Sequence, residues 1–156
     1  MVWQGQADLR TKAEDVVRLG EADTEDMLDL TTMAFPGFFR TGTPQMGRYF
    51  GIRQGALLAA MAGERMSLTG HREISAVCTH PLFTGRGYAA RLVLGLVALI
   101  LEMGIVPFLH VGEANARARD LYRRLGFVDR CVLPMWLVER GEARTQLSEM
   151  HRSSKH

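Results

Sequence analysis

The sequence predicts an α/β fold in which a mixed, mostly antiparallel sheet carries helices on both of its faces. Three observations indicate this fold class. Short β-type runs separated by turn residues follow one another between positions 49 and 79. An apolar segment of helical length comes next, at 88–103. A strand, a second helix and a last β-type run then complete the pattern, which is most simply built as one sheet covered by helices.

The first part of the chain predicts one strand and one helix. Residues 1–14 are polar and predict an irregular lead-in, and 16–19 predicts a short strand. Asp23 and Thr24 are N-cap residues, and apolar residues follow them at helical spacing. Pro36-Gly37 ends this helix.

A loop and a three-stranded meander follow. Residues 38–47 contain two glycines and a proline, which predicts a mobile loop. Gln54-Gly55 and the segment around Gly70 are turn signals. The strands that these turns connect are expected at 49–53, 56–64 and 73–79.

The second half alternates helices and strands. The helix at 88–103 is apolar nearly all round, which is typical of a helix buried against a sheet. A short strand is expected at 107–111, and a helix with one apolar stripe at 115–125. A last β region should reach from Phe127 to Val138, interrupted at Pro134.

Length and composition indicate one globular domain. The chain has 156 residues, of which 47% are hydrophobic and 23% are charged. We expect a single domain over 1–140 and a polar, disordered tail over 141–156. The net charge of +2 is too small to favour nucleic acid as a partner.

The sequence favours a reduced, cytoplasmic protein. Cys78 and Cys131 lie in apolar, strand-like runs, and we expect both to be reduced core residues. The N-terminal residues have no basic-then-apolar signal pattern. The longest apolar stretch, 92–101, is too short to cross a bilayer, so no membrane partner is expected.

A glycine loop at a helix start is the most informative feature. Gly85-Arg86-Gly87-Tyr88-Ala89 leads directly into the apolar helix. Two glycines there let backbone N–H groups close around an anion, most often a phosphate. Gly85-x-Gly87-x-x-Ala90 also matches the dinucleotide fingerprint, but that motif requires the glycine directly after a strand.

A second motif helps to decide whether the ligand of the glycine loop is a dinucleotide or another phosphate-bearing cofactor. The run that begins at Asn115 reads NARARDLYRRLGF and ends at Phe127. With the glycine loop, it resembles the GNAT superfamily of acyl-CoA-dependent N-acyltransferases. The resemblance implies a GNAT-like sheet, acetyl-CoA as cofactor, and direct attack by a primary amine of a small molecule or peptide. A non-catalytic CoA-binding module and a dinucleotide-binding oxidoreductase are the alternatives.

The resemblance also implies which residues bind the cofactor. The superfamily's loop usually begins with Arg or Gln where this chain has Thr84, so one side-chain contact to the diphosphate is missing, and Arg86 can compensate. The strand 76–79 would bind the pantetheine and the thioester carbonyl, and Asn115 would both cap its helix and contact the pantetheine. The full set is Val77, Cys78, Thr79, Gly85, Arg86, Gly87, Tyr88, Ala89, Ala90 and Asn115.

Two residues are predicted to be catalytic. Tyr122 lies on the apolar stripe of its helix and, by resemblance, protonates the departing CoA sulfur. Glu73 opens the strand before the loop and, by resemblance, is the general base, commonly through a water. Partial burial would have to bring the Glu73 pKa nearer neutrality. Glu64 is the reserve base, and structural roles are favoured for His80 and His110.

No metal site is predicted, because no pair of residues has metal-ligand spacing. The acceptor site is expected between the 35–49 loop and the C-terminal strands, where Phe38, Phe39 and Tyr49 either line it or pack the core. Pro134, Met135 and Trp136 are assigned either to a homodimer contact or to a wall of the acceptor site.

Overall fold

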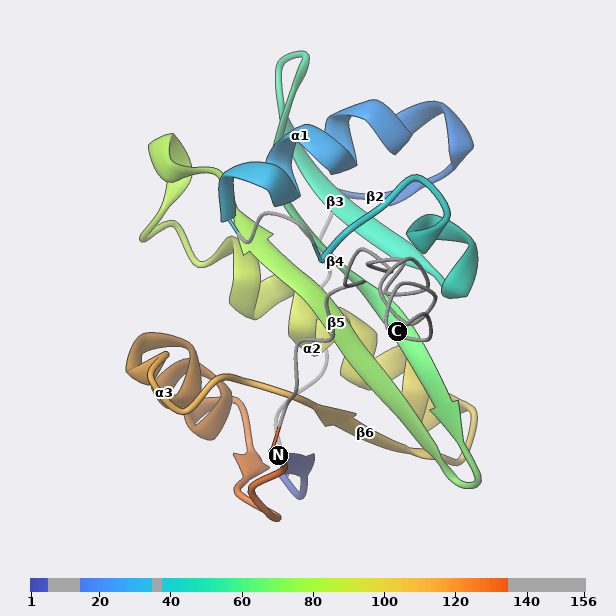
Figure 1. Cartoon of the computed structure of the whole chain (residues 1–156), viewed down its shortest axis with the longest axis vertical. Coiled ribbons are helices and arrows are strands. Elements are labelled where there is room, and N and C mark those ends of the chain that lie inside the picture. Colours follow the sequence, from blue (N-terminus) through green and yellow to red (C-terminus); the bar gives the residue numbers. More distant parts are fainter. Residues whose placement is uncertain (6–14, 35–37, 135–156) are drawn as a thin grey trace, which may run out of the picture.

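The computed structural model describes residues 1–5, 15–34 and 38–134. Its strands form one seven-stranded sheet in the order β2-β3-β4-β5-β6-β1-β7 (Figure 1). The strands are β1 (Val2–Trp3), β2 (Val16–Leu19), β3 (Tyr49–Gln54), β4 (Leu57–Leu68), β5 (His71–Thr79), β6 (Val106–Leu109) and β7 (Phe127–Val128).

The pairing confirms the predicted mixed, mostly antiparallel sheet. Strands β2 to β5 form an antiparallel series, and β1 is antiparallel to both β6 and β7. The pair β5–β6 is parallel, with α2 as its crossover. This topology does not fit the parallel sheet that a dinucleotide fingerprint requires.

Helices lie on both faces of the sheet. They are α1 (Thr24–Ala34), α2 (Tyr88–Glu102) and α3 (Ala116–Arg124). Single 3₁₀ turns occupy Glu21–Asp23, Thr43–Met46 and Pro81–Phe83. All three helices were predicted within two residues, because each has a clear apolar stripe or cap.

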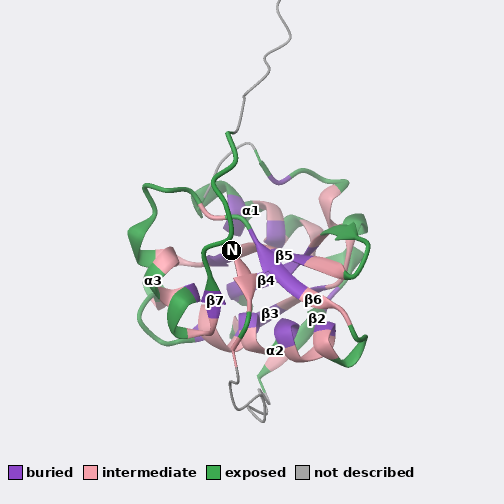
Figure 2. Cartoon of the chain, turned by 90° about the horizontal axis from the view of Figure 1, so that it is seen from below, coloured by how far each residue is buried: buried purple, intermediate pink, exposed green. Residues whose placement is uncertain are grey.

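Two hydrophobic clusters, one on each face, hold the helices to the sheet. On one face, Leu92, Leu96 and Ile100 of α2 pack against Ile52 and Ile74. On the other, Met27 and Leu30 of α1 pack against Tyr49, Met61 and Cys78. Figure 2 shows the buried residues gathered between the helices and the central strands. Each fully buried Leu or Ile stabilises the fold by roughly 1.5–3 kcal/mol.

The N-terminal lead-in is partly a strand, which corrects the sequence prediction. Val2 pairs with Phe108 of β6 and with Val128 of β7. The indole Nε1 of Trp3 donates to the Leu125 carbonyl at 3.1 Å. Two residues carry no readable periodicity, so only the long-range pairing makes this segment a strand.

The last β region is shorter than predicted. Strand β7 ends at Val128, and residues 129–134 have no regular structure. Val132 is 73% exposed and Cys131 is also exposed, so Cys131 is not the core residue expected, whereas Cys78 is buried. Apolar composition suggested a strand here, but Val132 and Leu133 are exposed and pair with none of the described strands. Pro36-Gly37, Met135, Trp136 and the tail 141–156 lie outside the described residues.

Within the described ranges, no helix combines the length and the apolar character that a membrane crossing requires.

Candidate active site

The glycine loop presents an open backbone surface at the start of α2. Gly85 and Gly87 have φ values of +80° and +76°, in the left-handed region that favours glycine. A Cβ added at either position would meet no heavy atom within 4 Å. The side chain of Thr84 does not join this surface, because its hydroxyl donates to the Pro81 carbonyl at 3.2 Å.

The N–H groups of this loop are available to a ligand. The first backbone bond at the start of α2 runs from the Arg91 N–H to the Gly87 carbonyl at 3.1 Å. The N–H groups of residues 85–90 have no acceptor within the described part of the chain. Free N–H groups at the positive end of a helix favour phosphate.

Two arginines flank the loop in different ways. The Arg91 guanidinium lies 5.0 Å from the Tyr88 ring centroid and pairs with Asp15 at 2.8 Å. Arg91 is therefore occupied by structural contacts. The Arg86 guanidinium stacks on the Phe83 ring, 5.1 Å from its centroid, and has no ion-pair partner among the described residues.

A bulge in β5 opens the sheet next to this loop. Met61 pairs with Cys78 and Gly63 pairs with Ser75, so two residues of β5 lie opposite the single Ala62. One of those two, Ala76, has a φ of +53° and is the only non-glycine residue with positive φ among the described residues.

The parallel pairing of β5 with β6 stops just before this bulge. Its last pair is Ile74 with Leu109, so beyond Ile74 the edge of β5 that faces β6 carries no ladder bonds. Val77, Cys78 and Thr79 lie on this free stretch. The structure therefore places the predicted pantetheine residues at an opening between two strands.

Cys78 itself is a poor nucleophile. Its side chain is 6% exposed, and burial raises the pKa of the thiol to about 12. A thiol with that pKa stays protonated at neutral pH and does not attack a thioester.

Tyr122 reaches the same opening from α3. Burial, with a smaller contribution from nearby Cys78, raises the pKa of the Tyr122 phenol to about 12. Its ring packs edge-on against Phe127, 6.0 Å away. Asn115 caps α3 as predicted, since its side-chain oxygen accepts from the Ala118 N–H at 3.1 Å. A buried, protonated phenol thus lies beside the free stretch of β5.

Glu73 lies on the α1 side of the sheet at the start of this opening, and it is fully buried. Arg65 donates to both of its oxygens, through Nε at 3.0 Å and Nη2 at 2.5 Å. Nδ1 of His110 lies 2.8 Å from Oε1. Sequence reasoning missed both partners, since neither belongs to a local motif.

The electrostatics of Glu73 differ from the expectation. Burial alone would raise the pKa of its carboxyl, but the hydrogen bonds from Arg65 and His110 hold it below its ordinary value. A Glu73 pKa nearer neutrality, which the general-base role would require, is therefore not what the structure has. The reason is that the carboxylate is buried together with its counter-charge.

The reserve candidates have structural partners. Glu64 pairs with Arg48 at 2.6 Å; burial opposes ionisation, but the Arg48 bonds prevail and lower the Glu64 pKa. Arg48 also contacts the Met103 sulfur beyond the end of α2, and Glu64 pairs with Ile74 of the α2 face, so this pair lies on the opposite face of the sheet from Glu73. His80 accepts the Leu82 N–H at 3.2 Å and caps the Pro81–Phe83 turn.

The predicted acceptor residues divide between core and surface. Phe39 and Tyr49 are buried and meet edge-to-face at 5.7 Å, whereas Phe38 is 67% exposed. Among the residues that the structure describes, no group of three His, Cys, Asp or Glu side chains is placed to hold a metal ion.

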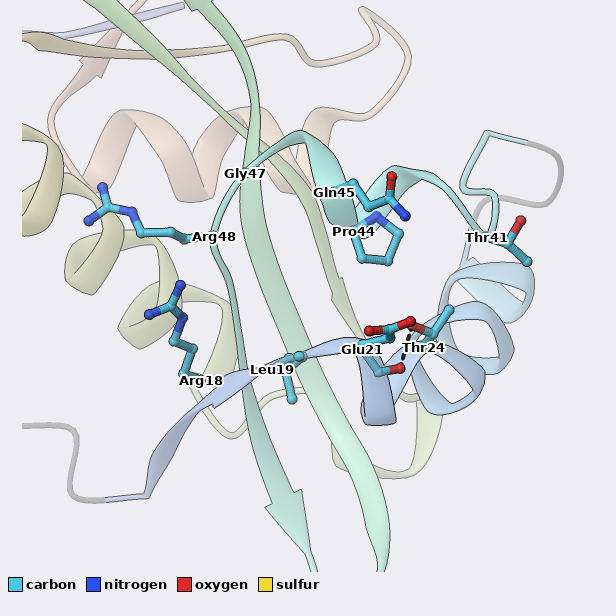
Figure 3. A pocket seen from close by; sticks show the side chains of 10 residues that line it. Arg18, Leu19, Glu21, Thr24, Thr41, Pro44, Gln45, Gly47 and Arg48 are labelled. Carbon is cyan, nitrogen blue, oxygen red and sulfur yellow. Dashed lines mark hydrogen bonds between the residues drawn. The ribbon is translucent and has the colours of Figure 1, made fainter.

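A cavity of about 710 Å³ lies at the β2 edge of the sheet. Figure 3 shows Arg18 and Arg48 on one side of it, and Pro44 and Gln45 opposite. Strand β2 is three strands from β5, which is about 14 Å at about 4.8 Å per strand. This cavity is separate from the opening between β5 and β6.

Comparison with known proteins assigns the fold. The FR47-like protein family model matches residues 49–136, which is more than half of the chain. A solved structure from Novosphingobium aromaticivorans, assigned to the GNAT acetyltransferases, is 39% identical with a TM-score of 0.76. The match covers 83% of this chain, which spans only 57% of that protein.

More distant structures share the fold. The ribosomal-protein-S18-alanine N-acetyltransferase of Escherichia coli is 22% identical, with a TM-score of 0.65 over 74% of this chain and 78% of that one. An Agrobacterium tumefaciens structure assigned as an acetyltransferase is 17% identical, with a TM-score of 0.67 over 78% and 99%. No curated protein matches in sequence. With the sheet, the glycine loop and the β5 bulge, the family match shows that this chain belongs to the FR47-like family of the GNAT superfamily.

Proposed function

We propose that the protein is an N-acetyltransferase that moves the acetyl group of acetyl-CoA to a primary amine of a small molecule or peptide by direct attack. The observation that carries this proposal is the Ala76 bulge, where β5 leaves β6 beside the buried Tyr122 phenol. A thioester lying in that opening has backbone donors on one side and a proton donor on the other.

The cofactor would be held mainly by backbone. The free N–H groups of residues 85–90 and the positive end of α2 would bind the diphosphate. Arg86 adds a charge next to it, in place of the side chain that Thr84 does not supply. Val77, Cys78, Thr79 and Asn115 would contact the pantetheine arm.

The groups on the two sides of the opening would serve different steps of the acetyl transfer. The amine nitrogen attacks the thioester carbon, the C–N bond forms and the C–S bond breaks. Tyr122 gives its proton to the departing sulfur. Burial raises the pKa of the phenol and so keeps this proton in place before the reaction. The amine loses its proton on the side of the sheet that holds Glu73. Because Cys78 is buried and protonated, we favour direct attack over an acyl-cysteine intermediate.

A second candidate function is a CoA-binding module without catalysis. It is favoured by Thr84, which removes a usual diphosphate contact while leaving the loop backbone open. We also place the protein in the cytoplasm, where its free thiols, Cys78 and Cys131, would stay reduced.

Calorimetric titration with acetyl-CoA, CoA and NADH tests the cofactor. We expect heat from acetyl-CoA and CoA and none from NADH. A panel of primary amines, followed by thiol release, then tests turnover. Binding with no turnover by any amine would favour the module, and tight NADH binding without acetyl-CoA heat would contradict both candidates.

A further inference from the structure

A row of residues crosses the sheet on the α1 face and ends at the opening. Tyr49 of β3 pairs with Gly63 of β4, and Gly63 pairs with Ser75 of β5. Leu109 and Ile74 form the last pair of β6 with β5, and His110 is the next residue along the chain. His110 therefore stands where β6 separates from β5, at the place proposed for the thioester.

The Glu73 carboxylate determines how the His110 ring is oriented. Its lowered pKa keeps the carboxyl ionised at neutral pH, so its oxygens only accept hydrogen bonds. The contact of 2.8 Å between Oε1 and Nδ1 therefore requires a proton on Nδ1. In the neutral ring this leaves the lone pair on Nε2, at the end of the ring opposite Glu73.

Glu73 and His110 differ in how far solvent can reach their side chains. The Glu73 side chain is 1% exposed, and both of its oxygens already accept from Arg65. The His110 side chain is 39% exposed. An incoming amine can reach the imidazole but not the carboxylate beneath it.

A buried hydroxyl on the same row has no partner. Tyr49 is 2% exposed, and its Oη finds no hydrogen bond within the described ranges. Burial raises the pKa of this phenol to about 12, and the charges of Arg65 and Glu73 act on it more weakly and in opposite directions. The Tyr49 hydroxyl therefore lies on the same face as Glu73 and His110, without a hydrogen-bond partner among the described residues.

We propose that His110 is the general base of the reaction and that Glu73 is a positioning residue that holds it. This inference rests on the acetyltransferase function proposed above and specifies its proton acceptor. The substrate ammonium carries two protons that must leave. One goes to Nε2 of His110 and then to solvent, and the other replaces the proton that Tyr122 gives to the CoA sulfur. The products are the amide, CoA with a free thiol, and one released proton.

The structure also supplies a matched control. Phe108 packs edge-on against two histidine rings, His110 at 5.7 Å and His71 at 6.4 Å. His71 contacts the Thr69 carbonyl instead of a carboxylate. Of the titratable or charged groups, Glu73 on β5 contacts the His110 ring, and Arg65 on β4 contacts Glu73. His71 on β5 packs on the same Phe108 ring, and the ammonium of Met1 donates to the carbonyl of Leu109, the residue before His110. The charges of Arg65 and Glu73 also act on Tyr49 of β3.

The first experiment needs no substrate. Long-range ¹⁵N–¹H correlation spectra of the labelled protein report which ring nitrogen carries the proton, and H110Q assigns the signal. We expect the Nδ1–H tautomer in the wild type and its loss in E73M, which keeps a long side chain but removes the oxygen that accepts from Nδ1. An Nε2–H tautomer in the wild type would overturn the inference.

The second experiment measures turnover with an amine that the wild type acetylates. We expect H110Q to lower kcat by about 10²–10⁴-fold, with KM for acetyl-CoA unchanged, and H71Q to behave as wild type. The fall of kcat at acid pH in the wild type should disappear in H110Q. Free imidazole should restore part of the activity of H110A, because the site is open enough to admit it.

The possible results distinguish a failure of the His110 assignment from a failure of the proposed acetyltransferase function. If H110Q retains wild-type kcat while the wild type turns over, His110 is not the base and the acetyltransferase function stands. Equal losses in H110Q and H71Q would also overturn the assignment, because they would reflect packing against Phe108. A wild type that binds no acetyl-CoA and acetylates no amine removes the proposed function, and this inference with it.

Discussion

The Tyr49 ring lies directly across Gly63, its cross-strand partner. A Cβ added at Gly63 would come within 2.2 Å of Cδ1 of Tyr49. Only glycine lets the ring cross β4 at this point, and the crossing carries the Tyr49 hydroxyl toward Arg65 and Glu73. A glycine inside a long strand therefore has a specific packing role here.

G63A should destabilise the protein by about 1–3 kcal/mol, because the added methyl group forces the ring out of a packed core. The midpoint of urea unfolding should fall with no change in slope. G95A is the control: Gly95 lies in α2 with nothing within 4 Å of its added Cβ, and alanine favours a helix. Equal stabilities of the two variants would contradict the packing role of Gly63.

G87A should weaken acetyl-CoA binding. Alanine in the left-handed conformation of Gly87 costs roughly 1–2 kcal/mol, and a loop that escapes this strain no longer aligns its N–H groups. Affinity should therefore fall by about 5–30-fold in calorimetric titration. G55A carries a matched strain, with φ of +61° in the turn between β3 and β4, and should bind acetyl-CoA as the wild type does. The same loss in both variants would mean that the effect is not local to the loop.

Y122F should lower kcat by about 10²-fold or more, because it removes the proton donor to the CoA sulfur. The ring and its packing on Phe127 remain, so the melting temperature and the acetyl-CoA affinity should stay close to wild type. Thiol release in the steady state measures kcat. Wild-type turnover by Y122F would remove Tyr122 from the chemistry and leave it as a core aromatic residue.

The Glu64–Arg48 pair should make stability depend on pH. The Arg48 hydrogen bonds, opposed by burial, hold the folded pKa of Glu64 below the ordinary value of 4.5. The stabilisation is therefore complete above that value and is lost as the pH falls through the lowered folded pKa. Urea unfolding between pH 7 and 3 should show a smaller fall in the free energy of unfolding for E64Q than for wild type. E113Q, at an exposed position, is the control and should retain the wild-type slope.

Several elements were predictable because their signals are local. The stripe of α2, the Asn115 cap of α3 and the turns at Gly55 and Gly70 all depend on residues close together in the chain. The open glycine loop was also predictable, because its residues are neighbours in the sequence. Tyr122 was expected to be buried from its place on the α3 stripe, and it is.

Strand β1 and the bulge at Ala76 left no such signal. Val2 and Trp3 form a strand only because they pair with β6 on one side and with β7 on the other. An alanine with positive φ is unfavourable locally, and the register of β4 against β5 imposes it.

By itself, the sequence determined the fold class, the order of most elements, the open glycine loop and the position of Tyr122, since periodicity and caps are properties of neighbouring residues. The tertiary structure alone decided which groups surround Glu73. Arg65 comes from β4 and His110 from the end of β6, and strand pairing brings both to one carboxylate. Their hydrogen bonds reverse the effect of burial on its pKa, and neither partner can be identified from the residues next to Glu73.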